Sequence, residues 1–232
     1  MEMANIMARL LHRDASVLVL DKPAGIAVHR EAGAARSETL TDWLDALRFG
    51  LPRRPELAHR LDRETSGCLV LGRHPRALAR LSSLFASNEV EKTYWAVVEG
   101  VPEASSGVID LPLAEDARAF GRRRMRPDPN GKPASTRWDV LASQGGLSWL
   151  ALTPLTGRTH QLRVHCAASG WAILGDTRYG GGAGPLMLHA RRIVIPFQPR
   201  KPAIAVEAPP PGTLCDAIRK AGGSNCDVLM NA

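Results

Sequence analysis

The segment HRLDRETSGCLVLGR (residues 59–73) joins a charged turn to an apolar run, and it decides the fold that we expect around it. One carboxylate, Asp62, stands between Arg60 and Arg63, and nearby positive charges favour the ionised form of an aspartate. The Thr-Ser-Gly that follows is turn chemistry, and residues 68–71 predict a strand. Asp62 is therefore a candidate nucleophile or general base. Taken alone, the same pattern more often marks a structural Asp–Arg pair at a surface.

Positive charge is concentrated in one segment of the chain. The net charge is +7, and residues 118–137 hold seven basic residues against one acid, which accounts for +6 of it. Glycines and prolines in GRRRMRPDPNGKP predict a mobile basic loop over 118–134. A basic patch on an otherwise balanced protein favours binding to a polyanion, most often nucleic acid. The candidate phosphate contacts are Arg122, Arg123, Arg124 and Arg126. The alternative is a solvated run of charge without a ligand.

Length and composition predict one domain over residues 1–232, with 1–10 as an N-terminal extension and 222–232 as a frayed tail. The four cysteines form no CxxC pair and no zinc-ligand spacing, so we expect reduced, buried thiols. No apolar run is long enough for a signal sequence or a membrane helix. These features predict a cytoplasmic protein without a membrane partner.

Strands with interspersed helices, and no regular βαβ repeat, predict an α+β fold with a mixed, mainly antiparallel sheet and flanking helices. Runs rich in β-branched and aromatic residues predict strands at 16–21, 91–100, 107–112, 135–142, 147–155 and 188–197. Helical spacing of apolar residues predicts helices at 39–47, 75–88, 156–170 and 213–221. The glycine-rich GDTRYGGGAG (175–184) lacks nucleotide-binding spacing and predicts a tight connection.

A second cluster of functional side chains lies in TGRTHQLRVHCAASG (156–170). Thr156 is a possible N-cap, and a helix here turns Leu162, Cys166 and Ser169 toward the core, whereas a strand would place Gln161, Arg163 and His165 on one face. In either case Arg163 can project away from the core. Two histidines occur without a third ligand at useful spacing, so we expect them to bond backbone or RNA rather than a metal.

Seven blocks in order resemble the RluA-type family of RNA pseudouridine synthases, and together they are far more specific than any one of them. The blocks are DKPAGIAVH (21–29), HRLDRETSG (59–67), EKTYWAVVEG (91–100), GRRRM with GKPAST (121–136), TGRTHQLRVH (156–165), GDTRYG (175–180) and LHA (188–190). The resemblance implies a single catalytic domain of the pseudouridine-synthase type. Unlike many relatives, the chain shows no N-terminal S4-like RNA-binding domain, because the first block begins within about twenty residues of Met1.

The resemblance also implies roles for individual residues. Asp62 is expected to be the essential catalytic aspartate, Tyr94 the aromatic residue that contacts the target uracil, and Arg163 the basic partner of the aspartate. Arg60 is expected to occupy the space that the extruded base leaves. The remaining candidate RNA contacts, besides the basic loop, are Arg158, His160, Gln161 and His165.

The reaction implied is the isomerisation of specific uridines in rRNA or tRNA, without a cofactor. Asp62 either attacks C1′ or takes a proton from C2′, and the sequence does not separate the two. The target base has to leave its stack, at a cost of a few kcal/mol. We expect an RNA stem-loop as substrate and a monomer without an obligate protein partner. Two alternatives are a non-catalytic RNA-binding or ribosome-assembly protein and a nucleoside hydrolase that uses Asp62 to activate water.

Overall fold

The computed structural model describes residues 6–29, 39–116, 124–180 and 182–224, which form two compact units. Unit 1 comprises Met1–Glu91 and Ala190–Pro209, and unit 2 comprises Lys92–His189 and Pro210–Ala232. Each unit combines antiparallel strands with helices, so the α+β class is confirmed. The frayed tail lies mostly outside the described residues, and the single catalytic domain stays a prediction.

Strands of unit 1 lie in the order β1 (Leu10–Arg13), β2 (Val17–Lys22), β4 (Ser66–Gly72) and β11 (Leu188–Ile195), the last belonging to this unit from Ala190 onward. The short β3 (Glu56–Leu57) pairs with β4, and β12 (Ile204–Glu207) pairs with β11. All seven residues of β4 are buried, because neighbours cover both of its faces. This explains why the strand after the HRLD turn is a continuous apolar run.

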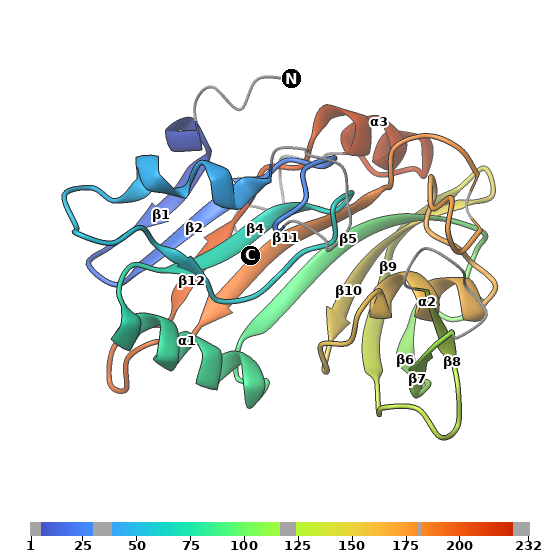
Figure 1. Ribbon diagram of the computed structural model, residues 1–232. Helices are drawn as coiled ribbons and strands as arrows, with labels where there is room; N and C mark the ends of the chain where they lie inside the picture. Colours follow the sequence, from blue (N-terminus) through green and yellow to red (C-terminus); the bar gives the residue numbers. More distant parts are fainter. Residues whose placement is uncertain (1–5, 30–38, 117–123, 181, 225–232) are drawn as a thin grey trace. The chain divides into compact units, whose positions relative to one another are not determined.

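Helix α1 (Pro75–Ala86) covers strand β4 of unit 1 (Figure 1). It begins as predicted with a proline in its first turn, and the His74 ring caps it by accepting a hydrogen bond from the Ala77 N–H at 3.2 Å. Leu81 and Leu84 are buried in the core that α1 forms with β2, β4, β11 and β12. A 3₁₀ helix, η1 (Ile6–Arg9), precedes β1, so the expected N-terminal extension is regular structure from Ile6 onward.

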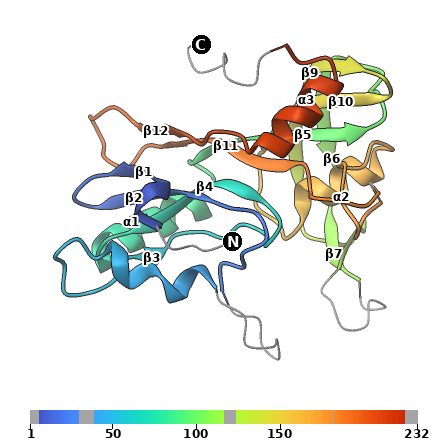
Figure 2. The same cartoon turned by 90° about the horizontal axis from the view of Figure 1, so that it is seen from above.

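Strands of unit 2 lie in the order β5 (Glu91–Glu99), β10 (Leu147–Pro154), β9 (Ser135–Gln144) and β6 (Ser106–Asp110), with every pairing antiparallel. Figure 2 shows helix α3 (Gly212–Lys220) against β10, which it contacts. The core between them includes Trp95 and Trp149, whose rings meet edge to face with centroids 4.9 Å apart. Among the described residues, no helix is long and apolar enough to span a membrane.

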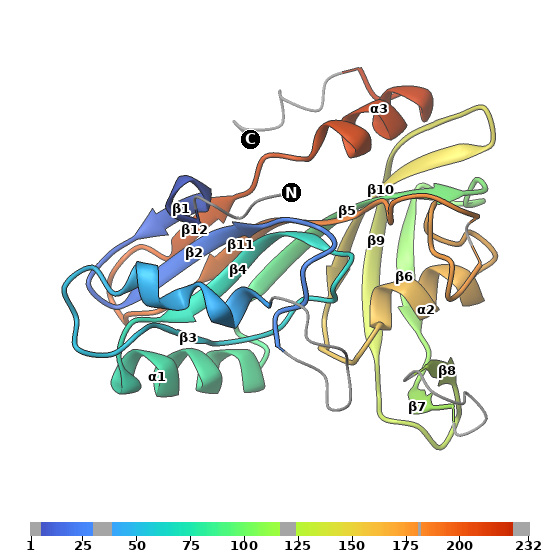
Figure 3. The ribbon, with the colours of Figure 1, turned by 45° about the horizontal axis from the view of Figure 1, so that its top comes forward.

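The basic loop predicted over 118–134 is partly a hairpin, which corrects the prediction. Strand β8 (Met125–Pro127) pairs antiparallel with β7 (Leu113–Glu115), beside helix α2 (Gln161–Ala168) in Figure 3. Residues 117–123, including Arg118, Arg122 and Arg123, lie outside the described residues. The prolines and glycines of this segment predict a loop. The strand forms because its backbone hydrogen bonds go to partners distant in sequence, including the Tyr179 hydroxyl.

The helix predicted over 39–47 is two 3₁₀ helices, η2 (Leu40–Asp42) and η3 (Leu44–Leu47), separated by Trp43. Its apolar face was predicted correctly, since Leu40, Leu44 and Leu47 are buried. A spacing of three residues also aligns side chains in a 3₁₀ helix, so the pattern did not distinguish the two helix types.

Candidate active site

Asp62 lies half-buried on the turn between β3 and β4 of unit 1. Its carbonyl oxygen accepts a hydrogen bond from the Thr65 N–H at 3.1 Å, and the neighbouring Leu61 is buried and anchors the turn. Arg60 is exposed. The candidate carboxylate is therefore carried by a turn whose backbone is held on both sides.

Lys22 clamps this turn from inside unit 1. Although it is a lysine, it is completely buried at the end of β2, and its Nζ donates to the carbonyl oxygens of Pro23 (2.8 Å), Ile26 (2.9 Å) and Arg63 (3.0 Å). Three carbonyl oxygens use all three donors of the ammonium. Burial lowers the pKa of Lys22 to about 8, against the opposing charges of Glu64 and Asp62. No motif in the sequence had marked this lysine as part of the site.

Arg63 completes the clamp, which differs from the role expected of it. Its Nε donates to the Gly25 carbonyl oxygen at 2.9 Å, while its own carbonyl oxygen accepts from the Gly25 N–H at 2.9 Å. Arg63 thus joins the loop after β2 to the turn that carries Asp62. His59 anchors the other end, because its Nε2 accepts from the Val70 N–H at 3.0 Å and its ring stacks on Phe85.

Only a glycine fits at position 67, directly after the turn that carries Asp62. Its φ is +106°, and a Cβ at this position would lie 2.3 Å from the Ala190 carbonyl oxygen. Any side chain would force the backbones of β4 and β11 apart. The glycine, the second residue of β4, therefore allows this strand to lie close against β11.

Arg163 lies on α2 in unit 2, where it is buried rather than projecting away from the core as expected. Its Nε donates to Asp176 Oδ2 at 2.8 Å and its Nη2 to Asp176 Oδ1 at 2.7 Å. A buried guanidinium requires such a partner, since an uncompensated buried charge is costly. The two-pronged geometry fixes the orientation of the guanidinium plane. A partnership of Arg163 with Asp62 stays a prediction.

Asp176 is a site residue that the sequence analysis missed. Burial alone would raise its pKa, but the hydrogen bonds and charge of Arg163 outweigh burial and hold the pKa of Asp176 below its ordinary value. Its Oδ1 also accepts from the Arg178 N–H (3.0 Å) and the Tyr179 N–H (3.2 Å). The only signal in the sequence was an acid in a glycine turn, GDTRYG.

Tyr94 lies half-buried on β5 in unit 2, opposite Leu152 of β10. The strand predicted at 91–100 is present as β5, and the flanking Trp95 is buried against Trp149. Tyr94 packs at the margin of the unit 2 core. Its contact with uracil stays a prediction.

Two of the candidate RNA contacts are internal to the protein, which corrects the prediction for them. Gln161 is buried and its Nε2 donates to the Ser135 carbonyl oxygen (2.9 Å), while His165 is fully buried between Thr136 Oγ1 (2.9 Å) and the Leu111 carbonyl oxygen (3.0 Å). Their side chains link α2 to the strands. The apolar pattern of the helix did not reveal that its polar residues also face inward.

The start of α2 also differs from the prediction. Its N-cap is His160 at a positive φ of 53°, whereas Thr156 lies before the helix and donates from Oγ1 to Gln161 Oε1 at 2.8 Å. His160 Nδ1 lies 2.7 Å from the Tyr179 hydroxyl. Arg158 is exposed and donates from Nε to the Pro133 carbonyl oxygen at 2.9 Å. Arg158 and His160 remain candidate RNA contacts.

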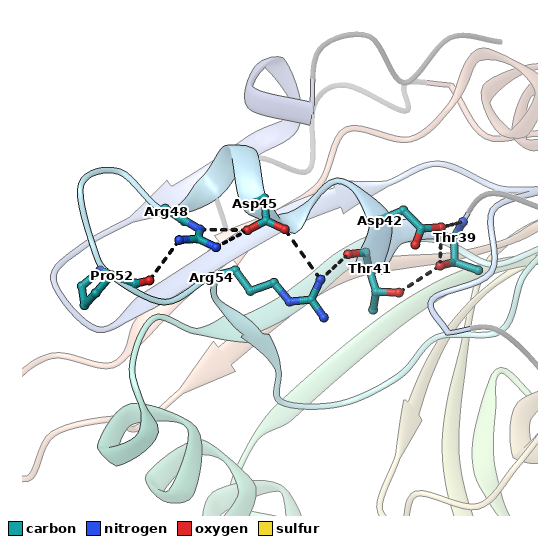
Figure 4. Close-up of polar contacts among 7 residues, drawn as sticks. All are labelled: Thr39, Thr41, Asp42, Asp45, Arg48, Pro52 and Arg54. Carbon is teal, nitrogen blue, oxygen red and sulfur yellow. Dashed lines mark hydrogen bonds and ion pairs between the residues drawn. The ribbon is translucent and has the colours of Figure 1, made fainter.

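Unit 1 also contains a surface pocket of about 540 Å³ that the sequence did not predict. Figure 4 shows the polar contacts of some of its lining residues. Its lining residues are Asp45, Arg48, Pro52, Arg53, Arg54 and Glu56. Asp45 accepts from Arg48 Nε at 2.8 Å, and Arg54 Nη1 donates to the Thr41 carbonyl oxygen at 3.1 Å. Three guanidiniums face two carboxylates, so the excess positive charge of the pocket is small.

The comparison with known proteins decides the family. A model of the RNA pseudouridylate synthase family matches residues 16–168, a range that includes Asp62, Tyr94 and Arg163. This chain belongs to the RluA-type RNA pseudouridine synthases. The synthase is 44% identical to an uncharacterized RNA pseudouridine synthase of Zymomonas mobilis over 90% of this chain and 96% of that protein. It is 34% identical to the ribosomal large subunit pseudouridine synthase C of Vibrio vulnificus, over 90% of this chain and 67% of that one.

Solved structures agree with this assignment. Human RNA pseudouridylate synthase domain containing 4 superposes on the synthase with a TM-score of 0.79 at 27% identity, over 94% of both chains. Human RNA pseudouridylate synthase domain containing 1 superposes with a TM-score of 0.74 at 28% identity, over 90% of this chain and 86% of that one. The synthase is therefore an isomerase that acts on RNA.

Proposed function

We propose that the synthase isomerises specific uridines in ribosomal or transfer RNA, with Asp62 as its catalytic residue. The observation that carries the proposal is the clamped turn. The half-buried carboxylate of Asp62 lies on a backbone that hydrogen bonds from Lys22 and Arg63 hold in place. A reacting group on a fixed backbone loses little entropy when it meets the substrate. The name of the Vibrio relative supports ribosomal RNA as one substrate.

The reaction redistributes bonds within one nucleotide. The C1′–N1 bond of uridine breaks, the uracil turns, and a C5–C1′ bond forms while C5 loses its hydrogen and N1 gains one. An ionised Asp62 either attacks C1′ or removes a proton from C2′, and both routes return the carboxylate at the end. No electrons are exchanged with another reactant.

Tyr94 is proposed to hold the detached uracil, and Arg163 is proposed to balance the charge of the catalytic carboxylate. The ring of Tyr94 offers a stacking surface worth about 1–3 kcal/mol for the detached uracil, and its hydroxyl is a candidate carrier of the C5 proton. The Arg163 guanidinium balances the charge of the catalytic carboxylate, for which its planar fork suits it better than a lysine. Arg60 takes the place of the everted base.

Basic residues are proposed to offset the cost of eversion. Removing a base from a stack costs a few kcal/mol, and less in a loop, so a stem-loop is the favoured substrate. Arg124 and Arg126 are exposed beside β8 and in it. Arg126 pairs with Asp128 at 2.6 Å, and a phosphate is proposed to compete with this carboxylate for the exposed guanidinium.

Release of tritium from C5-labelled uridine in transcribed ribosomal and transfer RNA tests this function. The expected result is stoichiometric release from one RNA class, with the label retained in the other. RNA binding without release overturns the proposal in favour of a non-catalytic RNA-binding protein, and free uracil among the products overturns it in favour of a hydrolase. Pseudouridine mapping in cells with and without the gene then identifies the modified position.

A further inference from the structure

Tyr179 lies half-buried in the turn after Asp176 and joins three parts of unit 2. Its backbone N–H donates to Asp176 Oδ1 at 3.2 Å, which fixes the turn. Its side chain packs with Met125 against a small core of Leu113, Ala134 and Val164, drawn from β7, the segment before β9, and α2. Neither the sequence analysis nor the proposed reaction assigns this residue a role.

The Tyr179 hydroxyl is bonded on both sides. It accepts a hydrogen bond from the Met125 N–H, the first amide of β8, at 2.9 Å. A second hydrogen bond joins the hydroxyl to His160 Nδ1, 2.7 Å away, and the tautomer of the histidine sets which of the two groups donates. Burial raises the pKa of Tyr179, so the phenol keeps its own hydrogen. One hydroxyl thus connects strand β8 to the N-cap of the helix that carries Arg163.

The Tyr179 ring contacts two guanidiniums. Arg163 Cζ lies over the ring at 5.3 Å from its centroid, and Arg124 Cζ at 5.5 Å. Both distances are within the range in which a cation is attracted to an aromatic face. Because Asp176 holds Nε and Nη2 of Arg163, the ring adds a second constraint on the same guanidinium. A change in the ring position therefore changes the environment of Arg163.

We propose that Tyr179 is a positioning residue that couples RNA binding by β8 to the placement of Arg163. The inference rests on the proposed function, because it assigns Arg163 to the reaction and Arg126 of β8 to RNA. A phosphate bound at Arg126 fixes the position of β8. The hydrogen bond from the Met125 amide then fixes the Tyr179 hydroxyl, and the Tyr179 ring in turn fixes the position of Arg163. Binding energy from a remote part of the RNA is then used to complete the reacting site, which is how such energy raises the rate of the chemical step.

Two substitutions separate the hydroxyl from the ring. Tyr179→Phe removes the bonds to Met125 and His160 and keeps the ring, whereas Tyr179→Leu removes both. The single-turnover rate of tritium release at saturating RNA is expected to fall about tenfold in Tyr179→Phe, because losing both hydroxyl bonds loosens the N-cap of the helix that carries Arg163. A further fall is expected in Tyr179→Leu. Thr177→Val, an exposed position in the same turn, serves as the matched control and should retain the wild-type rate.

Combining these variants with Arg126→Ala distinguishes coupling from a merely structural role. In the wild type, Arg126→Ala should weaken RNA affinity and also lower the saturated rate severalfold. In the Tyr179→Phe background, the loss of affinity should persist while the additional loss of rate disappears. Equal rate effects of Arg126→Ala in both backgrounds overturn the inference, as does a wild-type rate in Tyr179→Phe.

The outcome is separable from that of the proposed function. If the wild type releases no tritium from any RNA, the proposed function fails. If the wild type is active and the two substitutions act independently, only the coupling through Tyr179 fails. Thermal unfolding of each variant checks that it is folded, and Tyr179→Phe carries the test if Tyr179→Leu does not fold.

Discussion

The ammonium of Lys22 lies 3.0 Å from the carbonyl oxygen of Arg63, the residue that follows the candidate nucleophile Asp62. Two further carbonyl oxygens, of Pro23 and Ile26, fill the remaining donor positions of the ammonium. Burying the charged form of a lysine costs solvation free energy when no carboxylate forms an ion pair with it. Its use here is to hold two loops of unit 1 together at the turn that carries Asp62.

Replacing Lys22 with methionine should therefore impair catalysis more than folding. The substitution leaves three carbonyl oxygens without this donor and frees the turn, and small displacements of a reacting group cost about 100-fold in rate. We expect a loss of about that size in single-turnover tritium release, and a loss of about 1–3 kcal/mol in unfolding free energy. The exposed Lys220→Met is the control. A wild-type rate in Lys22→Met would show that the clamp does not position Asp62.

The same lysine predicts a dependence of stability on pH. Its pKa is about 8 in the folded protein, below its ordinary value of 10.5, so between these values the unfolded chain binds a proton that the folded protein lacks. The stability of the wild type relative to Lys22→Met should then rise with pH across this window, by up to about 1.4 kcal/mol per unit. Chemical denaturation of both proteins from pH 7 to 10.5 measures it. A constant difference would contradict the lowered pKa.

Local patterns in the sequence predicted most of the fold. The strand predicted at 147–155 is β10 (Leu147–Pro154) and the helix predicted at 75–88 is α1 (Pro75–Ala86), because apolar periodicity and a first-turn proline are local properties. Strand β8 was missed because its pairing with residues 113–115 overrides a loop-like composition. The split of the 39–47 helix was missed because 3₁₀ and α spacing overlap.

Clamp residues of the site were harder to predict, because their partners are distant in sequence. Lys22 and Arg63 are 41 residues apart, and Tyr179 and Met125 are 54 apart. Asp62 was singled out by its flanking arginines, whereas the roles of Tyr94 and Arg163 came from family blocks, which mark residue types without their contacts. A lysine at the end of an apolar strand and an aspartate in a glycine turn were the available signals. Only the fold shows that each is buried against a specific partner.

Asp62→Asn tests the catalytic assignment directly. An amide neither attacks C1′ nor accepts a C2′ proton at a useful rate, so tritium release should fall on the order of 10³-fold or more. RNA affinity should change little, because the substitution is nearly isosteric. Glu64→Gln, an exposed acid on the same turn, is the matched control and should stay within about twofold of wild type. Appreciable activity in Asp62→Asn would move catalysis to another residue.

Asp176→Asn should destabilise the protein, because it leaves the buried Arg163 guanidinium without its carboxylate. Removing one partner of a buried pair costs about 3–5 kcal/mol. The pKa of Asp176 is lowered in the folded protein, so its contribution is present above the ordinary pKa and is lost as the pH falls through the folded value. The stability gap between wild type and variant should therefore narrow in acid.

Denaturant titrations from pH 7 to pH 3 measure this gap. The exposed pair of Asp216 and Arg219 on α3 supplies the control, and Asp216→Asn should have almost no effect at any pH, because water screens exposed pairs. A small effect of Asp176→Asn at pH 7 would mean that Arg163 does not depend on this partner.

Salt dependence tests whether the basic segment contacts RNA phosphates. Each phosphate contact contributes about 0.7–0.9 to the slope of log affinity against log salt, since bound cations release counterions. Replacing Arg122, Arg123 and Arg126 together with alanine should lower the slope by about 2–3 if all three bind phosphate. Arg219→Ala removes one exposed arginine from α3 and should leave the slope unchanged. Filter binding of a stem-loop RNA from 50 to 300 mM salt, about a sixfold range, resolves such a difference. Equal slopes for the wild type and the triple variant would exclude the segment from the RNA-binding surface.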